Sequence, residues 1–281
     1  MRLIERWDKK IRRGIFVDDG TFNVPANCRV LGITSTKRKS IENLLSLKQL
    51  EGLHLYPVRA DDLPVLGQLT TLKALFLYDI RVPSLEAIAS LKGLTALRIM
   101  HAHKLKTLRG LDRLRELQAL DIYHVPNTHS LDALAGLSNM RELSISMSMG
   151  TTVPLRFKSF TPLSGMHDLR VLTLSGVHPG DHSLRPLTTL RNLQHLTVSS
   201  DHPLPEYARL AASFPPTVLE RCGPLFRQRV LRCKKCNRGL VLLVGKLPKI
   251  SRRLVCPKCN EKLVDQHIKL FDHWVQKWRA R

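Results

Sequence analysis

The sequence predicts an α/β solenoid in which short parallel strands form a single curved sheet, with short helical turns on its convex side and a small metal-binding module at its C-terminal end. Two observations carry this prediction. An apolar pattern, L-x-x-L-x-x-L-x-L, recurs seven times in phase, and two Cys-x-x-Cys pairs stand near the C-terminus. Charge separates the two parts, because residues 222–281 hold 16 basic residues against 3 acidic ones.

The seven copies recur at nearly constant spacing, as the repeats of a solenoid do. The last two apolar residues of each copy are two apart, as in a strand that sends alternate side chains to one face. So short a strand is not stable alone, and stacking buries the leucines of one repeat against those of the next. A weaker copy at Leu31 and Ile33 predicts an eighth strand. The third apolar positions, at steps of 22, 22, 23, 23, 29 and 24 residues, are Leu53, Leu75, Leu97, Leu120, Leu143, Leu172 and Leu196.

The stretches between the strands predict the convex side. Several contain a serine followed by an L-x-x-L or L-x-x-I piece, beginning at Ser84, Ser130 and Ser183. Serine is a preferred N-cap residue because its hydroxyl accepts a hydrogen bond from a free backbone N–H. We therefore expect short capped helical turns at these places.

This pattern resembles the leucine-rich repeat superfamily in its short form of about 22 residues, found in bacterial internalin-like proteins and eukaryotic phosphatase regulatory subunits. The resemblance covers residues 29–200. It implies a curved solenoid whose concave face binds protein. The family usually places Asn three residues after the last strand leucine, and this sequence does not, so we expect the turn that leaves each strand to differ. The residues at those positions are Val58, Ile80, Ala102, Val125, Ser148, Val177 and Asp201.

The residues that flank the strand leucines are expected on the concave face. The first four repeats offer aromatic and long side chains there, whereas the later three offer mostly serine and threonine. Tyrosine, methionine and arginine are enriched at the centres of protein interfaces. The alternative is that these rings only pack on one another. We predict a protein-binding surface in the first half, at His54, Tyr56, Phe76, Tyr78, Arg98, Met100, Asp121 and Tyr123.

The four C-terminal cysteines predict a metal site. Cys233 and Cys236 are separated from Cys256 and Cys259 by a spacing typical of structural zinc. Four thiolates complete the tetrahedron that Zn²⁺ accepts and leave no open position, so we predict one structural zinc ion per chain. The region resembles a zinc ribbon. Redox chemistry and iron in a similar four-sulfur site are the alternatives.

The predicted ribbon is strongly basic, which favours an anionic partner. Basic zinc ribbons contact nucleic acid through its phosphates before its bases. A cationic module that only closes the solenoid or contacts an acidic protein is the other interpretation. Nucleic-acid contacts, if present, are predicted at Arg232, Lys234, Lys235, Arg238, Arg252, Arg253 and Lys258.

These observations divide the chain and restrict its function. The predicted parts are an N-terminal cap (1–28), the repeat solenoid (29–200), a C-terminal cap and Pro-rich linker (201–226), the basic zinc ribbon (227–264) and a helical tail (265–281). Phosphate loops, G-x-S-x-G and H-E-x-x-H motifs are absent from the sequence, so we predict no enzyme and no small-molecule substrate. Without a signal peptide or a long apolar run, we expect a cytoplasmic protein without a membrane contact. The predicted function is an adaptor for an unidentified protein, and the alternative is nucleic-acid binding through the ribbon.

Overall fold

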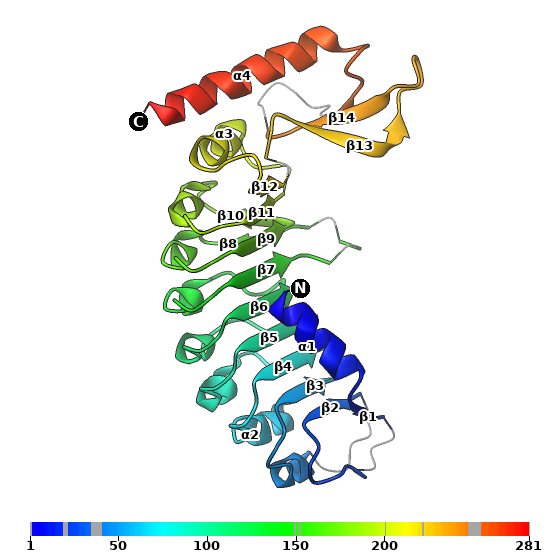
Figure 1. Cartoon of the computed structure of the whole chain (residues 1–281), viewed down its shortest axis with the longest axis vertical. Coiled ribbons are helices and arrows are strands. Elements are labelled where there is room, and N and C mark those ends of the chain that lie inside the picture. The colour runs from blue at the N-terminus through cyan, green and yellow to red at the C-terminus, as the bar shows by residue number, and fades with distance from the viewer. Residues whose placement is uncertain are drawn as a thin grey trace.

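One ten-stranded parallel sheet forms the framework of the protein (Figure 1). The computed structural model describes residues 2–18, 22–34, 41–148, 150–151, 153–199, 201–220, 222–246 and 254–280. The expected α/β fold with a single long parallel sheet is confirmed. In spatial order its strands are β1 (Ile15–Val17), β2 (Val30–Ile33), β3 (Gly52–Leu55), β4 (Ala74–Tyr78), β5 (Ala96–Met100), β6 (Ala119–Tyr123), β7 (Glu142–Ser146), β9 (Val171–Ser175), β11 (His195–Val198) and β12 (Leu219–Glu220).

The register of the sheet follows the sequence repeat. Leu53 lies beside Leu75, Leu75 beside Leu97, and the same column continues to the last repeat. These side chains are fully buried, so each repeat closes the core of its neighbour. The predicted eighth strand is β2, and β1 adds a further strand before it. A short parallel pair joins β8 (Leu155–Phe157), in the long fifth step of the repeat, to β10 (Val177–Pro179) in the sixth.

Short 3-10 helices cover the convex side. Three of them follow the predicted serines, whose hydroxyls accept hydrogen bonds from the backbone two residues later: Ser84 from Glu86, Ser130 from Asp132 and Ser183 from Arg185, at 3.3, 3.0 and 3.2 Å. These contacts are ST-turns, which start the helical turns that the sequence predicted. The convex elements are η1 (Glu42–Ser46), η2 (Ala60–Asp62) with α2 (Leu63–Leu66), η3 (Glu86–Ser90), η4 (Leu111–Arg113), η5 (Asp132–Leu134), η6 (Thr161–Leu163) and η7 (Arg185–Thr189).

The turns that leave β4, β5 and β6 share one backbone conformation. After β4, β5 and β6, the chain passes through one residue with positive φ: Asp79 (50°), His101 (53°) and His124 (60°). That conformation directs the next side chain inward, so the missing Asn is replaced by buried apolar residues such as Ile80 and Val125. The backbone N–H groups of these turns find acceptors in the next repeat. The N–H of Asp79, for example, donates to the carbonyl of Met100 at 3.0 Å.

A helix and a small antiparallel sheet close the C-terminal end of the solenoid. The helix is α3 (Leu204–Ser213), and the sheet consists of β13 (Leu225–Arg232), β14 (Gly239–Leu243) and β15 (Leu254–Val255). The last helix, α4 (Glu261–Arg279), begins before the predicted boundary at 265 and lies along α3 (Figure 1). There the indole N–H of Trp278 donates to the carbonyl of Pro205 at 3.0 Å.

The N-terminal helix, α1 (Leu3–Arg12), lies across the concave side of the sheet instead of beyond its end (Figure 1). Within the segment predicted as an N-terminal cap, β1 therefore extends the edge of the sheet, while α1 covers its face. None of the helices in the described ranges combines the length and apolar content that crossing a bilayer requires.

Candidate interaction surface and metal centre

The helix α1 packs on the first half of the concave face. Its apolar residues Ile4, Trp7 and Ile11 recur at intervals of three and four residues, which places them on one side of a helix. All three are buried against strands β2 to β6. They form a small core that is separate from the leucine core on the other side of the sheet.

A column of small residues makes room for this helix. Four neighbouring strands begin with Gly52, Ala74, Ala96 and Ala119, which lie side by side in the register. A Cβ atom at Gly52 would lie 3.2 Å from the Trp7 ring, and the three alanines are fully buried. Longer side chains in this column would lift the helix, because protein cores have little spare volume.

Ion pairs and a helix cap complete the docking of α1. The guanidinium group of Arg98 lies 2.6 Å from Asp8 on the helix and 2.9 Å from Asp121 on the sheet. Burial alone would raise the pKa of Asp8, but the hydrogen bond from Arg12 and the charge of Arg98 outweigh it and lower the pKa. At the start of the helix, the N–H of Leu3 donates to both carboxylate oxygens of Glu142, at 2.8 and 3.0 Å. A carboxylate at this position also favours the positive end of the helix dipole.

Three of the eight predicted binding residues take part in this contact between α1 and the sheet: Phe76, Arg98 and Asp121. Phe76 is 1% exposed, with the guanidinium of Arg98 over its ring at 4.6 Å. Arg98 keeps 14% of its side-chain surface and is held between Asp8 and Asp121. While α1 is in place, these residues are not available to a partner. The sequence predicted these positions on the concave face but did not show that α1 covers part of that face.

The other five predicted residues lie together along the open edge of α1. Tyr78, Met100 and Tyr123 occupy consecutive rungs in one column of the sheet. Tyr56 follows β3 on the preceding rung and is 40% exposed. His54 is half-buried between the rings of Phe16 and Tyr78, with ring centroids 5.9 and 4.8 Å away. Burial lowers the pKa of His54, so its neutral ring behaves as part of this aromatic surface. We call Tyr56, Tyr78, Met100 and Tyr123 the tyrosine row.

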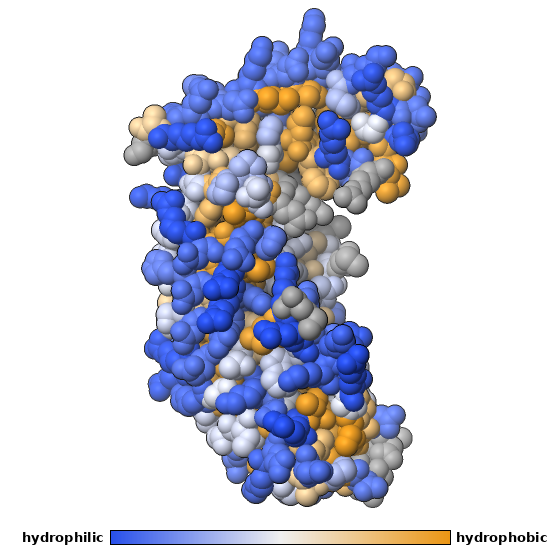
Figure 2. All heavy atoms as spheres, in the orientation of Figure 1, coloured by the Kyte–Doolittle hydropathy of each residue, from blue (hydrophilic) through white to orange (hydrophobic). Residues whose placement is uncertain are grey.

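Apolar side chains continue from the tyrosine row toward the edge of the sheet. Ile15 and Phe16 on β1 are both exposed by more than a third. Figure 2 shows an apolar area at this end of the molecule, over β1 and β2. Exposed apolar patches on soluble proteins mark interaction surfaces more often than single exposed residues do.

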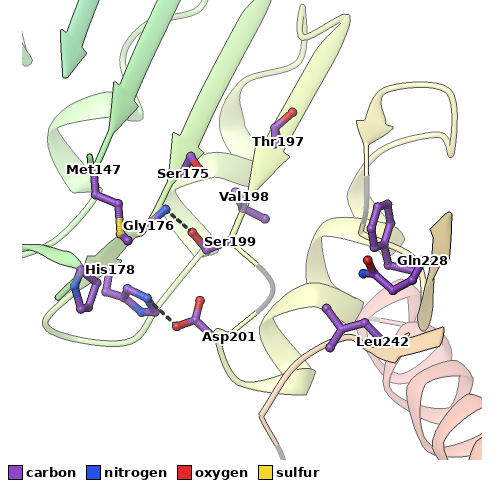
Figure 3. Close-up of a pocket in the computed structure, with 12 residues that line it drawn as sticks. Met147, Ser175, Gly176, His178, Thr197, Val198, Ser199, Asp201, Gln228 and Leu242 are labelled. Carbon is purple, nitrogen blue, oxygen red and sulfur yellow. Dashed lines mark hydrogen bonds and ion pairs between the residues drawn. The ribbon is translucent and has the colours of Figure 1, made fainter. Parts of the chain in front are cut away.

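A hollow of about 350 Å³ with mixed polar and apolar walls lies at the other end of the concave face, between the last repeats and the antiparallel sheet (Figure 3). Ser175 on β9, Thr197 on β11 and Ser199 just after β11 line it, and Gln228 lines it from β13. At its rim, the Nε2 atom of His178 lies 2.8 Å from a carboxylate oxygen of Asp201. This hollow belongs to the junction of the solenoid with the C-terminal module.

The four predicted cysteines meet at one point. Their sulfur atoms all lie within 4.8 Å of one another, and three of the Sγ–Sγ distances are 3.4, 3.6 and 3.8 Å. A tetrahedral ion with metal–sulfur bonds of about 2.3 Å separates its ligands by about 3.8 Å. The donor set therefore fits one four-coordinate metal ion, with Cys233 and Cys236 on one side and Cys256 and Cys259 on the other.

Backbone hydrogen bonds lower the pKa of two of these thiols, Cys233 and Cys256. Hydrogen bonding from the Cys259 backbone N–H is the main cause that lowers the pKa of Cys256 to about 6. Hydrogen bonds with the neighbouring thiols, first that of Cys236, raise the pKa of Cys259 to about 12. A bound dication would favour the thiolate form of all four, because metal ligation deprotonates a thiol.

The basic residues around this centre point outward. The structure describes five of the seven predicted nucleic-acid contacts: Arg232, Lys234, Lys235, Arg238 and Lys258, all exposed. Across the described parts of the chain, none of the five forms an ion pair. Arg252 and Arg253 lie outside the described residues.

Sequence reasoning missed the covering helix, although two signals of it were present. Residues 3–12 carry apolar positions at helical spacing. The next columns of the same face carry larger side chains, but one column contains only small residues: Gly52, Ala74, Ala96 and Ala119. Each signal alone is weak. Together they indicate a helix seated on the concave face.

The comparisons with known proteins concern the fold. No family model matches the chain, and no curated protein matches it. Among solved structures it is similar to internalin C2 of Listeria monocytogenes, with 22% identity over 61% of this chain and 67% of that one, at a TM-score of 0.46. It is also similar to internalin F of the same organism, with 20% identity over 63% of each chain, at a TM-score of 0.37. The class that the chain's own sheet and repeats define is an α/β repeat solenoid.

Proposed function

We propose that this chain is a non-enzymatic protein-interaction module that recognises a partner protein through the tyrosine row beside α1. The observation that carries the proposal is the row itself: three half-buried or exposed tyrosines and a methionine on four consecutive rungs, with α1 forming one wall beside them. Tyrosine gives a large contact area with few rotatable bonds, so little entropy is lost when it is fixed by a partner. A reducing, cytoplasmic environment suits the free cysteines that the second part of the chain needs.

In this proposal, the C-terminal module is a structural zinc ribbon. Its cysteine centre has four sulfur donors and no position for a substrate, so zinc would stabilise the fold and take no part in catalysis. The module has a very small core of its own, with Val241, Leu243, Val255 and Val264 as its buried apolar residues. Modules of this size usually need a metal ion or disulfides to fold.

The proposal is tested by replacing the row in the intact protein. The triple variant Tyr56→Ala, Tyr78→Ala, Tyr123→Ala should lose the partners that wild-type protein captures in a quantitative affinity purification. The corresponding triple Phe variant keeps the rings and should retain most of the binding. Val153→Ser removes an exposed apolar side chain away from the row and is the control. Unchanged capture by the triple Ala variant, with unchanged thermal unfolding, would refute the tyrosine row.

A second candidate function is nucleic-acid binding by the ribbon, favoured by its exposed and unneutralised cations. Such binding gains free energy from the release of counterions and weakens steeply as salt increases. We expect the variant Lys234→Glu, Lys235→Glu to abolish binding of a labelled single-stranded oligonucleotide, whereas the triple Ala variant of the row should bind it normally. Absence of binding by the wild type at low salt would exclude this candidate.

A further inference from the structure

A group of arginines meets in a hollow next to the open half of the concave face. The hollow has a volume of about 390 Å³ and lies where the start of α1 reaches strands β6 to β11. Two of its arginines, Arg2 and Arg6, come from the α1 region, and Arg141 and Arg170 come from the residues just before β7 and β9. We call this the arginine hollow.

The sheet brings the second pair of arginines together. The N–H of Arg141 donates to the carbonyl of Gln118, that of Arg170 to Arg141, and that of Gln194 to Arg170, at 2.8, 2.9 and 2.7 Å. These residues therefore lie at the N-terminal ends of successive strands, about 4.8 Å apart. In spatial order, the column presents the amide of Gln118, the guanidinium groups of Arg141 and Arg170, and the amide of Gln194.

The docking of α1 brings the first pair to the same place. Glu142, the residue after Arg141, binds the N–H of Leu3 with both carboxylate oxygens. This contact fixes the beginning of the helix over β7, so that Arg2 and Arg6 face the column of the sheet. The arrangement therefore depends on residues almost 140 positions apart in the chain.

The four arginines are not neutralised by the protein. Across the described residues, none of them forms an ion pair. Glu142 is the acidic residue that lines the hollow, and its carboxylate already accepts the N–H of Leu3. Asp168 lines the adjoining hollow, which shares Arg141 and Arg170. Like charges held close together repel one another, and an external anion relieves this repulsion.

We propose that the arginine hollow binds a phosphate group on a phosphorylated side chain of the partner protein. Guanidinium groups bind phosphate through paired hydrogen bonds, and a phosphate near neutral pH carries close to two negative charges. The lining contains arginine, glutamine and histidine side chains but no Phe, Tyr or Trp ring on which a nucleic-acid base could stack. The inference extends the protein-interaction function proposed above and rests on it.

The test uses the full chain and peptide libraries of one design, with a central phosphoserine, serine or glutamate and random flanking residues. We expect the phosphoserine library to bind in a fluorescence anisotropy assay, the glutamate library to bind more weakly, and the serine library not to bind. The variant Arg141→Glu, Arg170→Glu should weaken phosphoserine binding by a factor of about ten or more. The variant Arg185→Glu, Arg191→Glu makes the same charge change around η7 on the convex side. It should alter phosphoserine binding by less than about twofold.

Each contrary result overturns the proposal. Equal losses in the two double variants would mean that the total charge of the protein attracts the peptide. Equal binding of the serine library would mean that phosphate is not recognised. If only a single-stranded oligonucleotide depends on Arg141 and Arg170, the ligand is a nucleic acid. The tyrosine row and the hollow share no residue, so the triple Ala variant of the row should keep phosphoserine binding, and failure of one proposal can be told from failure of the other.

Discussion

The two halves of the concave face are built on the same repeat but differ in what covers them. Across β3 to β6 the strands begin with glycine or alanine, and α1 lies on them with Trp7 buried. Across β7, β9 and β11 the strands begin with Glu142, Val171 and His195, and α1 reaches them only with its N-terminal end, at Glu142. The first half gains stability from an internal contact, whereas the second half stays open between α1 and the ribbon. The two halves differ in the size of the side chain at the first strand position, where only the small residues of the first half leave room for α1.

The largest expected effect is that of a zinc chelator on the C-terminal module, which we propose to be a zinc ribbon. Treatment with a strong zinc chelator should release about one metal ion per chain and unfold β13 to β15, because zinc binding supplies about 10–16 kcal/mol apparent in comparable small domains. Hydrogen exchange followed by mass spectrometry should then show loss of protection in the ribbon and at the end of the open half. Protection of α1 should not change. Persisting protection of β14 after complete chelation would mean that the module folds without metal.

A smaller effect is expected from removing the main apolar anchor of α1. Trp7→Ala should weaken the docking of the helix by about 3 kcal/mol, since truncation of a buried Trp typically costs 3–5 kcal/mol. Hydrogen exchange of residues 3–12 should become faster by a factor of about 100, while the leucine core remains protected. Lys9→Ala, on the exposed side of the same helix, is the control. Equal exchange in both variants would show that Trp7 is not the main anchor of α1.

The stability of the junction between the open half and the C-terminal module should depend on pH. His202 is buried there beside His178, Asp201, His182, Lys246 and the ring of Tyr207. Burial, followed by the charge of His178, lowers its pKa from 6.5 to about 4. The folded state therefore binds fewer protons than the unfolded state between these values.

The sign of this effect follows from the lowered pKa. The contribution of neutral His202 is fully present above about pH 6.5 and is lost as pH falls toward 4, at a total of about 3 kcal/mol. Urea unfolding of the wild type and of His202→Asn at several pH values measures it. The variant should show a shallower slope of unfolding free energy against pH, and equal slopes would contradict the assignment to His202.

The sequence was sufficient for those features that repeat or have a fixed spacing. The leucine columns, the serines before the convex turns and the two cysteine pairs depend on local patterns, and the structure places all of them as expected. The position of α1 could not be predicted in the same way, because its contacts join Leu3 to Glu142 and Asp8 to Arg98 across most of the solenoid. The strand β13 was also missed, since its exposed residues Val230 and Leu231 do not alternate like those of a half-buried strand.

The cap of α1 by Glu142 also has a consequence for the order in which the protein assembles. The helix precedes β3 to β7 in the chain, but its binding surface does not exist until β3 to β6 have formed, and its cap is made only when β7 is added. Contacts of such long sequence separation form late and slowly. Until then the apolar side of α1, with Ile4, Trp7 and Ile11, remains without a surface to cover it. A segment that is synthesised before its binding surface therefore docks only after that surface has formed, and its complete docking requires the strands up to β7.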